Sequence, residues 1–419
     1  MLMEPTTKTD ALRELRERAK LLFQKDGLPD KHHEEYKYCD ITRYWNTDFA
    51  QHPDTHSSPQ INIQSQLEKW HITPDDLLFV FVNGELTSYP EQAIPGIVFR
   101  QSDETPGEGE SAPGTFAKPE DDPLLARHYS VLQKYFSLQV LPKTQVEQTL
   151  VFLHISDVTV PCGISMHKCF SVGSLAQVSV KQIYCSTGGS GHLVQSTDEW
   201  NLMPGASVHN LRIQEETPEA ILLHHTCAHV QANASMNDYL ITLSGKLVRN
   251  NTVFRLAGKN AQSHLYGLYL TGDQMLTDNH TLVDHRVSDC YSNELYKGIL
   301  DGKSIAVFNG KIFVRKDAQK TNAYQSNKNI LLSPQSTINT KPQLEIFADD
   351  VKCSHGTSTG RLDEAAMFYL KSRGIGEAWA RKLLLMAFAD DMADKIPSEN
   401  DRLMLRGILE NRLAQAPHV

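Results

Sequence analysis

The sequence predicts a mainly β protein with α-helical regions at both ends, and three observations lead to this prediction. Residues 139–348 hold many short runs rich in Val, Ile, Leu, Tyr and Thr, separated by Gly, Asn and Asp, which is typical of strands joined by turns. Residues before 70 and after 362 place apolar side chains at helical spacing instead. No apolar stretch approaches the roughly 18 residues that a membrane-spanning helix needs.

The N-terminal region, residues 1–138, is expected to begin with a helix. Up to Lys25, Leu and Ala alternate with Arg, Lys and Glu, and there is no apolar segment followed by a small-residue cleavage site. We therefore expect a surface helix of a cytoplasmic protein. The helical and polar pattern continues to Trp70, interrupted by Gly and Pro.

A first β hairpin follows this helical segment. Residues 77–82 are apolar and extended in character, the dipeptide at 83–84 is Asn-Gly, which favours a tight hairpin turn, and residues 94–99 continue the extended character. Residues 101–123 are acidic and rich in Pro and Gly, so we expect a mobile surface loop. An amphipathic helix over 123–138 then leads into the core.

The central region, 139–348, is predicted to be an all-β core. Its clearest strand candidates are 149–155, 176–184, 239–248, 264–270 and 304–314. A sandwich, a barrel and a parallel β-helix all predict many short strands, and no fixed-period motif decides between them.

The C-terminal region, 349–419, is predicted to be helical. Helical spacing appears over 363–373, which ends at Gly374, a residue suited to the left-handed position after a helix. A second helix is predicted over 377–395, closed by Pro397. The sequence Ser-Glu-Asn-Asp from Ser398 has the form of a capping box and predicts a third helix to about residue 415.

Composition excludes several classes of function. The formal net charge of −9 makes nucleic acid an unfavourable partner. The seven cysteines are scattered and form no Cys-x-x-Cys pair, so we expect free thiols and no closed structural zinc site.

Two glycine-rich segments resemble catalytic loops, but neither fits its motif. Residues 298–304 are one residue short of a phosphate-binding loop and precede a strand pattern, where that loop requires a helix. Residues 188–192 surround Ser190 with glycines, yet His192 replaces the last glycine of a nucleophile elbow. We interpret residues 298–304 as a false match and the glycines of 188–192 as turn residues, and we expect no enzyme activity in this chain.

A series of short motifs between residues 308 and 375 resembles the SufB/SufD family of iron-sulfur cluster assembly proteins. In order they read FNGKI, AQKT, NKN, PQLEI, ADDVKCSHG and FYLKSRGI. Near the N-terminus, EYKYCDI at 35–41 is also similar to the family. The sequence Lys-Cys-Ser-His-Gly at 352–356 resembles the SufD branch, because SufB-type chains carry a His-Glu pair there.

The resemblance implies a fold and a set of partners. The fold is a right-handed parallel β-helix flanked by N-terminal and C-terminal α-helical regions. The partners are a SufB-type subunit, bound through the β-helix, and the SufC-type ATPase, bound through the C-terminal helices. The implied function is iron-sulfur cluster assembly as a scaffold subunit, without a stably bound cofactor and with iron or a nascent cluster passing through the SufB interface.

Cys353 and His355 are the candidate metal ligands. If this segment is a strand, the two side chains leave the same face with Cα atoms about 6.6 Å apart. A thiolate and an imidazole supply two of the donors that an iron species needs. Two donors are too few, and the resemblance also implies that the site is shared with SufB.

Two other groups of residues are candidates for binding. On a helix, His225 and His229 would share one face and could bind a metal. In a β core, His225, Cys227 and His229 share a face only as neighbours along a strand, and we adopt this interpretation. The sequence assigns no role to His224. The second C-terminal helix has an apolar surface wider than one core-facing stripe needs. We expect part of it to contact the SufC-type partner, through Trp379, Leu383, Leu384, Met386 and Phe388.

Two alternatives remain open at the level of the sequence. One is a β-helix polysaccharide lyase or hydrolase, although the core shows no clustered catalytic carboxylates beside Arg or Lys. The other is a self-paired scaffold, which as an isolated chain would form a homodimer.

Overall fold

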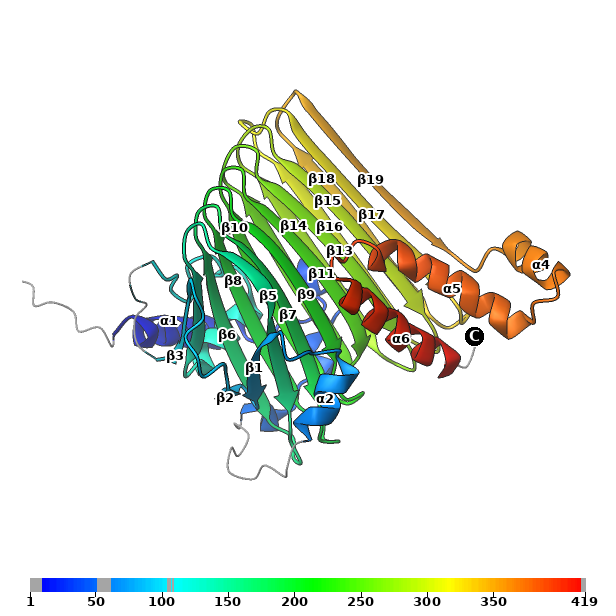
Figure 1. The fold of residues 1–419 in the computed structure, drawn as a ribbon, viewed down its shortest axis with the longest axis horizontal. Coiled ribbons are helices and arrows are strands. Elements are labelled where there is room, and N and C mark those ends of the chain that lie inside the picture. The colour runs from blue at the N-terminus through cyan, green and yellow to red at the C-terminus, as the bar shows by residue number, and fades with distance from the viewer. Residues whose placement is uncertain (1–9, 51–61, 104–106, 108, 416–419) are drawn as a thin grey trace, which may run out of the picture.

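A parallel β-solenoid forms the centre of the computed structural model, which describes residues 10–50, 62–103, 107 and 109–415. The chain coils so that successive strands alternate between two facing sheets (Figure 1). Sheet A contains ten strands and sheet B nine, and helices flank them at both ends of the chain. The predicted mainly β fold, with a parallel β-helix core between helical regions, is confirmed.

Sheet A has the strand order β19-β17-β15-β13-β11-β9-β7-β5-β1-β2. Its strands, in chain order, are β1 (Leu77–Val82), β2 (Glu85–Ser88), β5 (Gln145–Ser156), β7 (Gln177–Ser186), β9 (Ser207–Glu215), β11 (Ser235–Ser244), β13 (Gln262–Thr271), β15 (Tyr291–Leu300), β17 (Thr321–Leu331) and β19 (Val351–Gly360).

Sheet B has the order β18-β16-β14-β12-β10-β8-β6-β4-β3. Its strands are β3 (Ile97–Ser102), β4 (Tyr135–Val140), β6 (Gly163–Val172), β8 (Leu193–Leu202), β10 (Ile221–Val230), β12 (Leu247–Leu256), β14 (Leu276–His285), β16 (Ile305–Val314) and β18 (Thr337–Ile346).

Counted along sheet A, each coil of the solenoid takes 27 to 31 residues. This follows from one row of residues paired across sheet A, namely Val178, Val208, Met236, Ser263, Ser292, Ala323 and Cys353. The coil length varies, and the residues of this row are of different types. The sequence therefore shows no fixed period, although the backbone is regular.

The interior of the solenoid is filled by side chains from both sheets. Aromatic rings occupy the N-terminal coils, where Phe79 stacks on Phe152 and Phe170 stacks on Trp200 with ring centroids 4.0 Å apart. Aliphatic and further aromatic side chains continue this core through the later coils. Burial of apolar surface on this scale is the main stabilising contribution to the fold.

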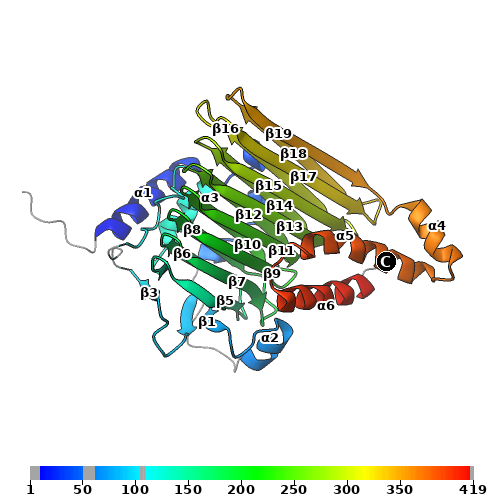
Figure 2. The same ribbon diagram turned by 45° about the horizontal axis from the view of Figure 1, so that its top comes forward.

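The outer faces of the two sheets are covered by the two ends of the chain (Figures 1 and 2). Sheet A packs against α2, α5 and α6, and its outward-facing Leu, Ile and Tyr side chains share one buried cluster with them. Sheet B packs against the N-terminal segments and α3. The helices are α1 (Asp10–Asp26), α2 (Ile63–Lys69), α3 (Pro123–Val131), α4 (Glu364–Ser372), α5 (Glu377–Ala393) and α6 (Glu399–Gln415), with 3-10 turns at Glu34–Tyr36, Ile41–Arg43 and Thr47–Ala50.

The N-terminal end of the solenoid is closed by the expected hairpin. Strands β1 and β2 pair antiparallel around Asn83 and Gly84, which have φ values of 51° and 88°. β1 also pairs parallel with β5, and β3 pairs antiparallel with β4. These short strands cover the first coil, so the edges of the sheets at this end do not extend the solenoid further.

Three expectations for individual segments were wrong. The helix expected over 123–138 ends at Val131, because the residues from Tyr135 alternate and pair with β6 as strand β4. The strand expected over 239–248 is two strands, since the chain turns at Gly245, which has a φ of 145°.

The third concerns the segment expected to be a mobile surface loop. Its part near Ala117 is packed against sheet B, because the buried carboxylate of Glu199 accepts hydrogen bonds from the backbone N–H groups of Gly114, Phe116 and Ala117. Composition could not reveal this partner, which lies more than eighty residues away in the chain.

The three C-terminal helices form as predicted. The carboxylate of Asp363 caps α4, Gly374 follows it with a φ of 84°, and the Ser398 hydroxyl accepts the backbone N–H of Asp401 at the start of α6. Strand β19 precedes them and ends at Gly360. Helices α5 and α6 lie on sheet A, whereas α4 extends away from the solenoid (Figure 1).

Candidate functional site

The C-terminal end of the solenoid is open, unlike its N-terminal end. β19 pairs with β17, and no described strand lies on its other side; β18 is likewise the last strand of sheet B. From Ser354 to Gly360 every residue of β19 is exposed. An edge strand of this length presents a row of unpaired backbone N–H and C=O groups, to which another chain can add a strand.

Cys353 and His355 lie on this edge strand and share one face. In the register of sheet A they pair with Ala323 and Gln325, two side chains that are buried inside the solenoid. Because directly paired residues point to the same face, Cys353 and His355 face the lumen where it opens at this end. The expectation that the two share a face of a strand is met.

The two candidate ligands differ in their surroundings. His355 is exposed, whereas Cys353 is half-buried beside the last apolar cluster of the core. Burial raises the pKa of the Cys353 thiol, although the backbone of Ala323 opposes this. Cys353 is therefore a neutral thiol near pH 7 and binds a metal only on losing its proton.

A buried carboxyl group lies two coils inward from Cys353 and His355, on β15. Glu294 accepts hydrogen bonds from the Thr281 hydroxyl at 2.6 Å and from the Gln325 amide at 3.3 Å. Burial raises the pKa of Glu294 to about 7, although both hydrogen bonds favour the ionised form. The open end thus combines one thiol and one imidazole with a carboxyl group behind Gln325.

Polar groups also occupy the N-terminal part of the lumen, which was not predicted. Lys168 donates to the Tyr184 hydroxyl at 2.7 Å and lies 3.0 Å from a carboxylate oxygen of Asp198. Asp198 also accepts from Gln182 at 2.8 Å and lies 3.4 Å from the Nε2 atom of His224. Single polar residues inside strands carry no sequence signal that separates an interior position from an exterior one.

Charges in this network balance each other. Burial disfavours the ionised form of Asp198, but Lys168 and His224 more than offset this and lower its pKa. Burial likewise lowers the pKa of Lys168, while Asp198 favours its charged form. A second pair of opposite charges, Arg212 with Asp238 at 2.9 Å, lies nearby. These pairs satisfy one another inside the core.

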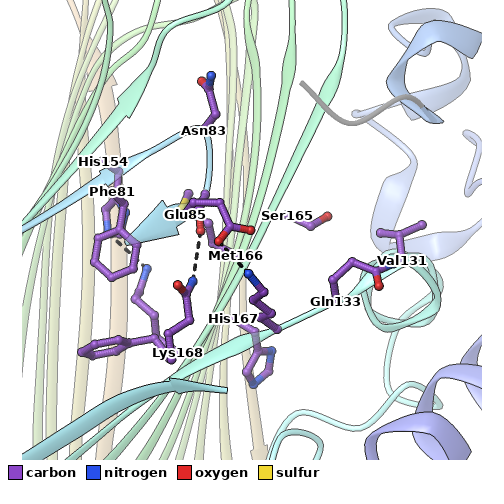
Figure 3. Close-up of a pocket in the computed structure, with 14 residues that line it drawn as sticks. Phe81, Asn83, Glu85, Val131, Gln133, His154, Ser165, Met166, His167 and Lys168 are labelled. Carbon is purple, nitrogen blue, oxygen red and sulfur yellow. Dashed lines mark hydrogen bonds and ion pairs between the residues drawn. The ribbon is translucent and has the colours of Figure 1, made fainter. Parts of the chain in front are cut away.

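A small cavity reaches this network from outside (Figure 3). It has a volume of about 60 Å³ and lies beneath the tip of the β1–β2 hairpin, with His154, His167 and Lys168 in its lining. The ion pair between Glu85 and Lys134, 3.0 Å long, borders its mouth. This cavity lies at the opposite end of the solenoid from Cys353 and His355.

The residues expected to contact a partner divide into two groups. Trp379 is 62% exposed and Leu383 is 43% exposed. Met386 and Phe388 are half-buried and pack against the cluster on sheet A, and Leu384 is also half-buried. Two further exposed aromatic residues, Phe368 and Tyr369 of α4, were not predicted. The exposed apolar surface therefore comprises Phe368, Tyr369, Trp379 and Leu383.

Helices α5 and α6 are attached to sheet A by charges as well as by apolar contacts. Lys297 on β15 lies 2.6 Å from Asp391 and donates to the backbone carbonyl of Phe388 at 2.8 Å. Lys181 on β7 lies 2.7 Å from Asp401. Both helices are thus connected to strands of sheet A by buried lysine side chains.

The histidines of β10 are separated by the strand. His224 points into the lumen, whereas His225 contacts Asn251 at 2.9 Å and His229 stacks on Phe116 outside sheet B. His225, Cys227 and His229 are strand neighbours, as we interpreted them. The two glycine-rich segments are also not catalytic loops: Gly298 lies within β15, and residues 188–191 form the turn between β7 and β8.

Of the helices in the described part of the chain, none combines the length and the apolar composition that a bilayer crossing requires.

Comparison with known proteins points to iron-sulfur cluster assembly. Residues 162–388 match the family described as "SUF system FeS cluster assembly, SufBD core domain", and residues 4–69 match the SufBD protein N-terminal region. The first match alone covers more than half of the 419 residues.

Several named proteins are similar to this chain. The iron-sulfur cluster assembly protein SufD of Escherichia coli is 27% identical over 392 residues, which are 92% of this chain and 90% of that protein. A SufBD family protein of Synechocystis is 33% identical over 59% of this chain and 56% of its own length. One of Mycobacterium leprae is 34% identical over 45% and 51%.

Proposed function

Because this chain belongs to the SufBD family of iron-sulfur cluster assembly proteins, we propose that it is a scaffold subunit that pairs with a SufB-type chain and binds a SufC-type ATPase. In this role it contributes to iron acquisition or to formation of the nascent cluster at the interface with SufB. Iron and sulfide are cargo here, and ATP hydrolysis belongs to the SufC-type partner.

The observation that carries the proposal is the open edge of β19 with Cys353 and His355 on its lumen-facing side. A partner that adds strands beyond β18 and β19 buries both side chains at the new interface. This chain then contributes a nitrogen and a sulfur donor, and the partner must supply the remaining ligands, because iron-sulfur clusters and iron take four or more.

The exposed apolar surface of α4 and α5 is the proposed contact for the SufC-type ATPase. Three exposed aromatic residues on two consecutive helices are typical of an interaction site, since aromatic side chains provide much of the binding energy at interfaces. The charged contacts of Lys297 and Lys181 connect these helices to sheet A. Movement of two ATPase subunits toward each other would therefore pull on the solenoid and open the contact around His355.

The first experiment is an affinity purification of the tagged chain from its native extract, with mass spectrometry of the proteins that co-elute. We expect a SufB-type chain and a SufC-type ATPase. Recovery of the chain alone, or only with itself, would remove the main support for the heteromeric role and would call for a direct assay on polygalacturonate.

The second experiment tests the metal-binding edge. His355→Ala should lower the rate of cluster formation by the reconstituted complex by about tenfold or more, the effect typical of damage to a metal site. Ser354→Ala, an exposed neighbour on the other face of β19, is the matched control. An unchanged rate in His355→Ala, with the complex intact, would contradict the role of this histidine.

The third experiment tests the ATPase contact. Trp379→Asp should weaken binding of the SufC-type partner by about 2 kcal/mol or more, because a central aromatic residue of an interface is lost. Leu21→Asp on α1 changes an equally exposed apolar residue far from this surface and should leave binding unchanged. Equal affinities of the two variants would exclude this surface as the contact.

A further inference from the structure

A buried group of three metal-binding side chains lies on the outer face of sheet B, and we propose that it binds one zinc ion. The side chains of His167, Cys169 and Glu199 each place a donor atom within 4.8 Å of the other two. All three are buried, and the group is separate from the open end that carries His355.

Strand geometry brings the three donors together. His167 and Cys169 are two residues apart on β6, so their side chains leave the same face. Glu199 on β8 pairs directly with Cys169 and completes the group from the adjacent strand. The site is thus built on two neighbouring strands of the rigid sheet rather than on a loop.

The donor set suits zinc. An imidazole nitrogen, a thiolate sulfur and a carboxylate oxygen are all ligands that zinc takes in proteins. The Nε2 atom of His167 lies 3.1 Å from the Oε1 atom of Glu199. Ligands held about 2.0–2.1 Å from a tetrahedral ion are roughly 3.4 Å apart, so an ion fits between these atoms with little movement. Formation of the zinc–sulfur bond releases the thiol proton of Cys169 to solvent.

Surrounding groups hold two of the ligands in position. The Nδ1 atom of His167 lies 3.1 Å from the Nε2 atom of His128, which orients the ring with Nε2 toward Glu199. Glu199 accepts hydrogen bonds from the Tyr129 hydroxyl at 2.9 Å and from three backbone N–H groups of residues 114–117. Such outer partners orient the ligands of protein metal sites.

The small cavity of Figure 3 borders one of the three ligands. His167 is part of its lining, and its volume of about 60 Å³ exceeds the roughly 10–15 Å³ needed for one water molecule. The cavity is therefore large enough for a water molecule beside His167. A bound ion would fasten α3 and residues 114–117 to sheet B, which gives the site a structural role.

The test uses the full chain. Protein purified from zinc-supplemented cells is dialysed and its metal content measured, and a second sample is unfolded with a chelator and refolded with cobalt(II) in place of zinc. We expect about one equivalent of zinc, and in the cobalt protein a thiolate-to-cobalt charge-transfer absorption. Cys169→Ser should lose both signals.

Two variants localise the signal. Cys227→Ser changes another buried thiol, which pairs with Glu199 from its other side in β10, and should keep both signals. The double variant Cys353→Ser with His355→Ala should also keep both signals, because that pair lies at the open end.

If Cys169→Ser does not fold, His167→Gln must lose the cobalt absorption. The proposal is overturned if wild-type protein shows neither zinc nor the cobalt absorption, or if Cys169→Ser or His167→Gln retains them.

Discussion

At the scale of single residues, Glu294 shows how the lumen near the open end responds to pH. Its carboxyl group is buried, and its pKa of about 7 lies above its ordinary value of 4.5. The folded protein therefore holds this proton more tightly than the unfolded chain does. The resulting contribution to stability is fully present below pH 4.5 and is lost as the pH rises through 7.

Replacement by the neutral isostere measures this contribution. Wild-type protein should lose about 3 kcal/mol of unfolding free energy through Glu294 between pH 4.5 and pH 8, because one pKa unit corresponds to about 1.4 kcal/mol. Glu294→Gln should lack this loss and be more stable than wild type at pH 8. Urea unfolding at several pH values measures it, with the exposed Glu219→Gln as control. Parallel pH profiles of wild type and Glu294→Gln would contradict the prediction.

At the scale of elements, one corner of each coil from β4 to β17 uses a residue in the left-handed backbone region. This corner follows the strands of sheet B, and Asn233 and Asn260 are among its residues with positive φ. Asn adopts this region readily. Leu175 occupies the same corner with a φ of 61° and is 57% exposed. The left-handed backbone therefore costs conformational free energy there, and burial of the side chain offsets little of it.

Leu175→Asn should therefore stabilise the protein. We expect a gain of about 0.5–1 kcal/mol, since a left-handed conformation costs an ordinary L-residue about 1–2 kcal/mol. Leu141→Asn is the matched control: Leu141 lies at the preceding corner, is partly exposed and has no positive φ, so its replacement should bring no gain. Thermal unfolding compares them. A lower melting temperature for Leu175→Asn than for wild type would show that its side-chain contacts outweigh the backbone cost.

At the scale of the whole molecule, the two ends of the solenoid differ. The first coil is closed by β1, β2 and β3, whereas β18 and β19 end the sheets without a further described strand. In a stacked fold each coil is stabilised by its two neighbours, so the last coil has the lowest local stability. This asymmetry gives the molecule one end at which another β-solenoid can continue the stack.

Amide hydrogen exchange tests this asymmetry. In the isolated chain β19 should exchange fastest among the solenoid strands, and β11, in the middle of sheet A, should be among the slowest. Addition of the SufB-type chain should protect β18 and β19. If β19 were as protected as β11 in the isolated chain at all protein concentrations, the edge would not be free. Protection that appears only at high concentration would indicate a homodimer through the same end.

The sequence by itself determined the class of fold, the three C-terminal helices and the family. Strand runs, helix caps and the motifs around Cys353 are local, so each can be read without knowing what packs against it. The placement of Cys353 and His355 on the same face of a strand also follows from strand periodicity alone.

Only the tertiary structure decided which polar residues meet. The pairs Lys168–Asp198 and Cys169–Glu199 come together because successive coils stack in register, and no short sequence window contains both partners. The same holds for residues 114–117, whose order depends on Glu199. The local sequence determines which residues form a strand, but the coil length determines which residue of the next coil lies beside a given residue. That length varies from coil to coil, and no sequence repeat marks it.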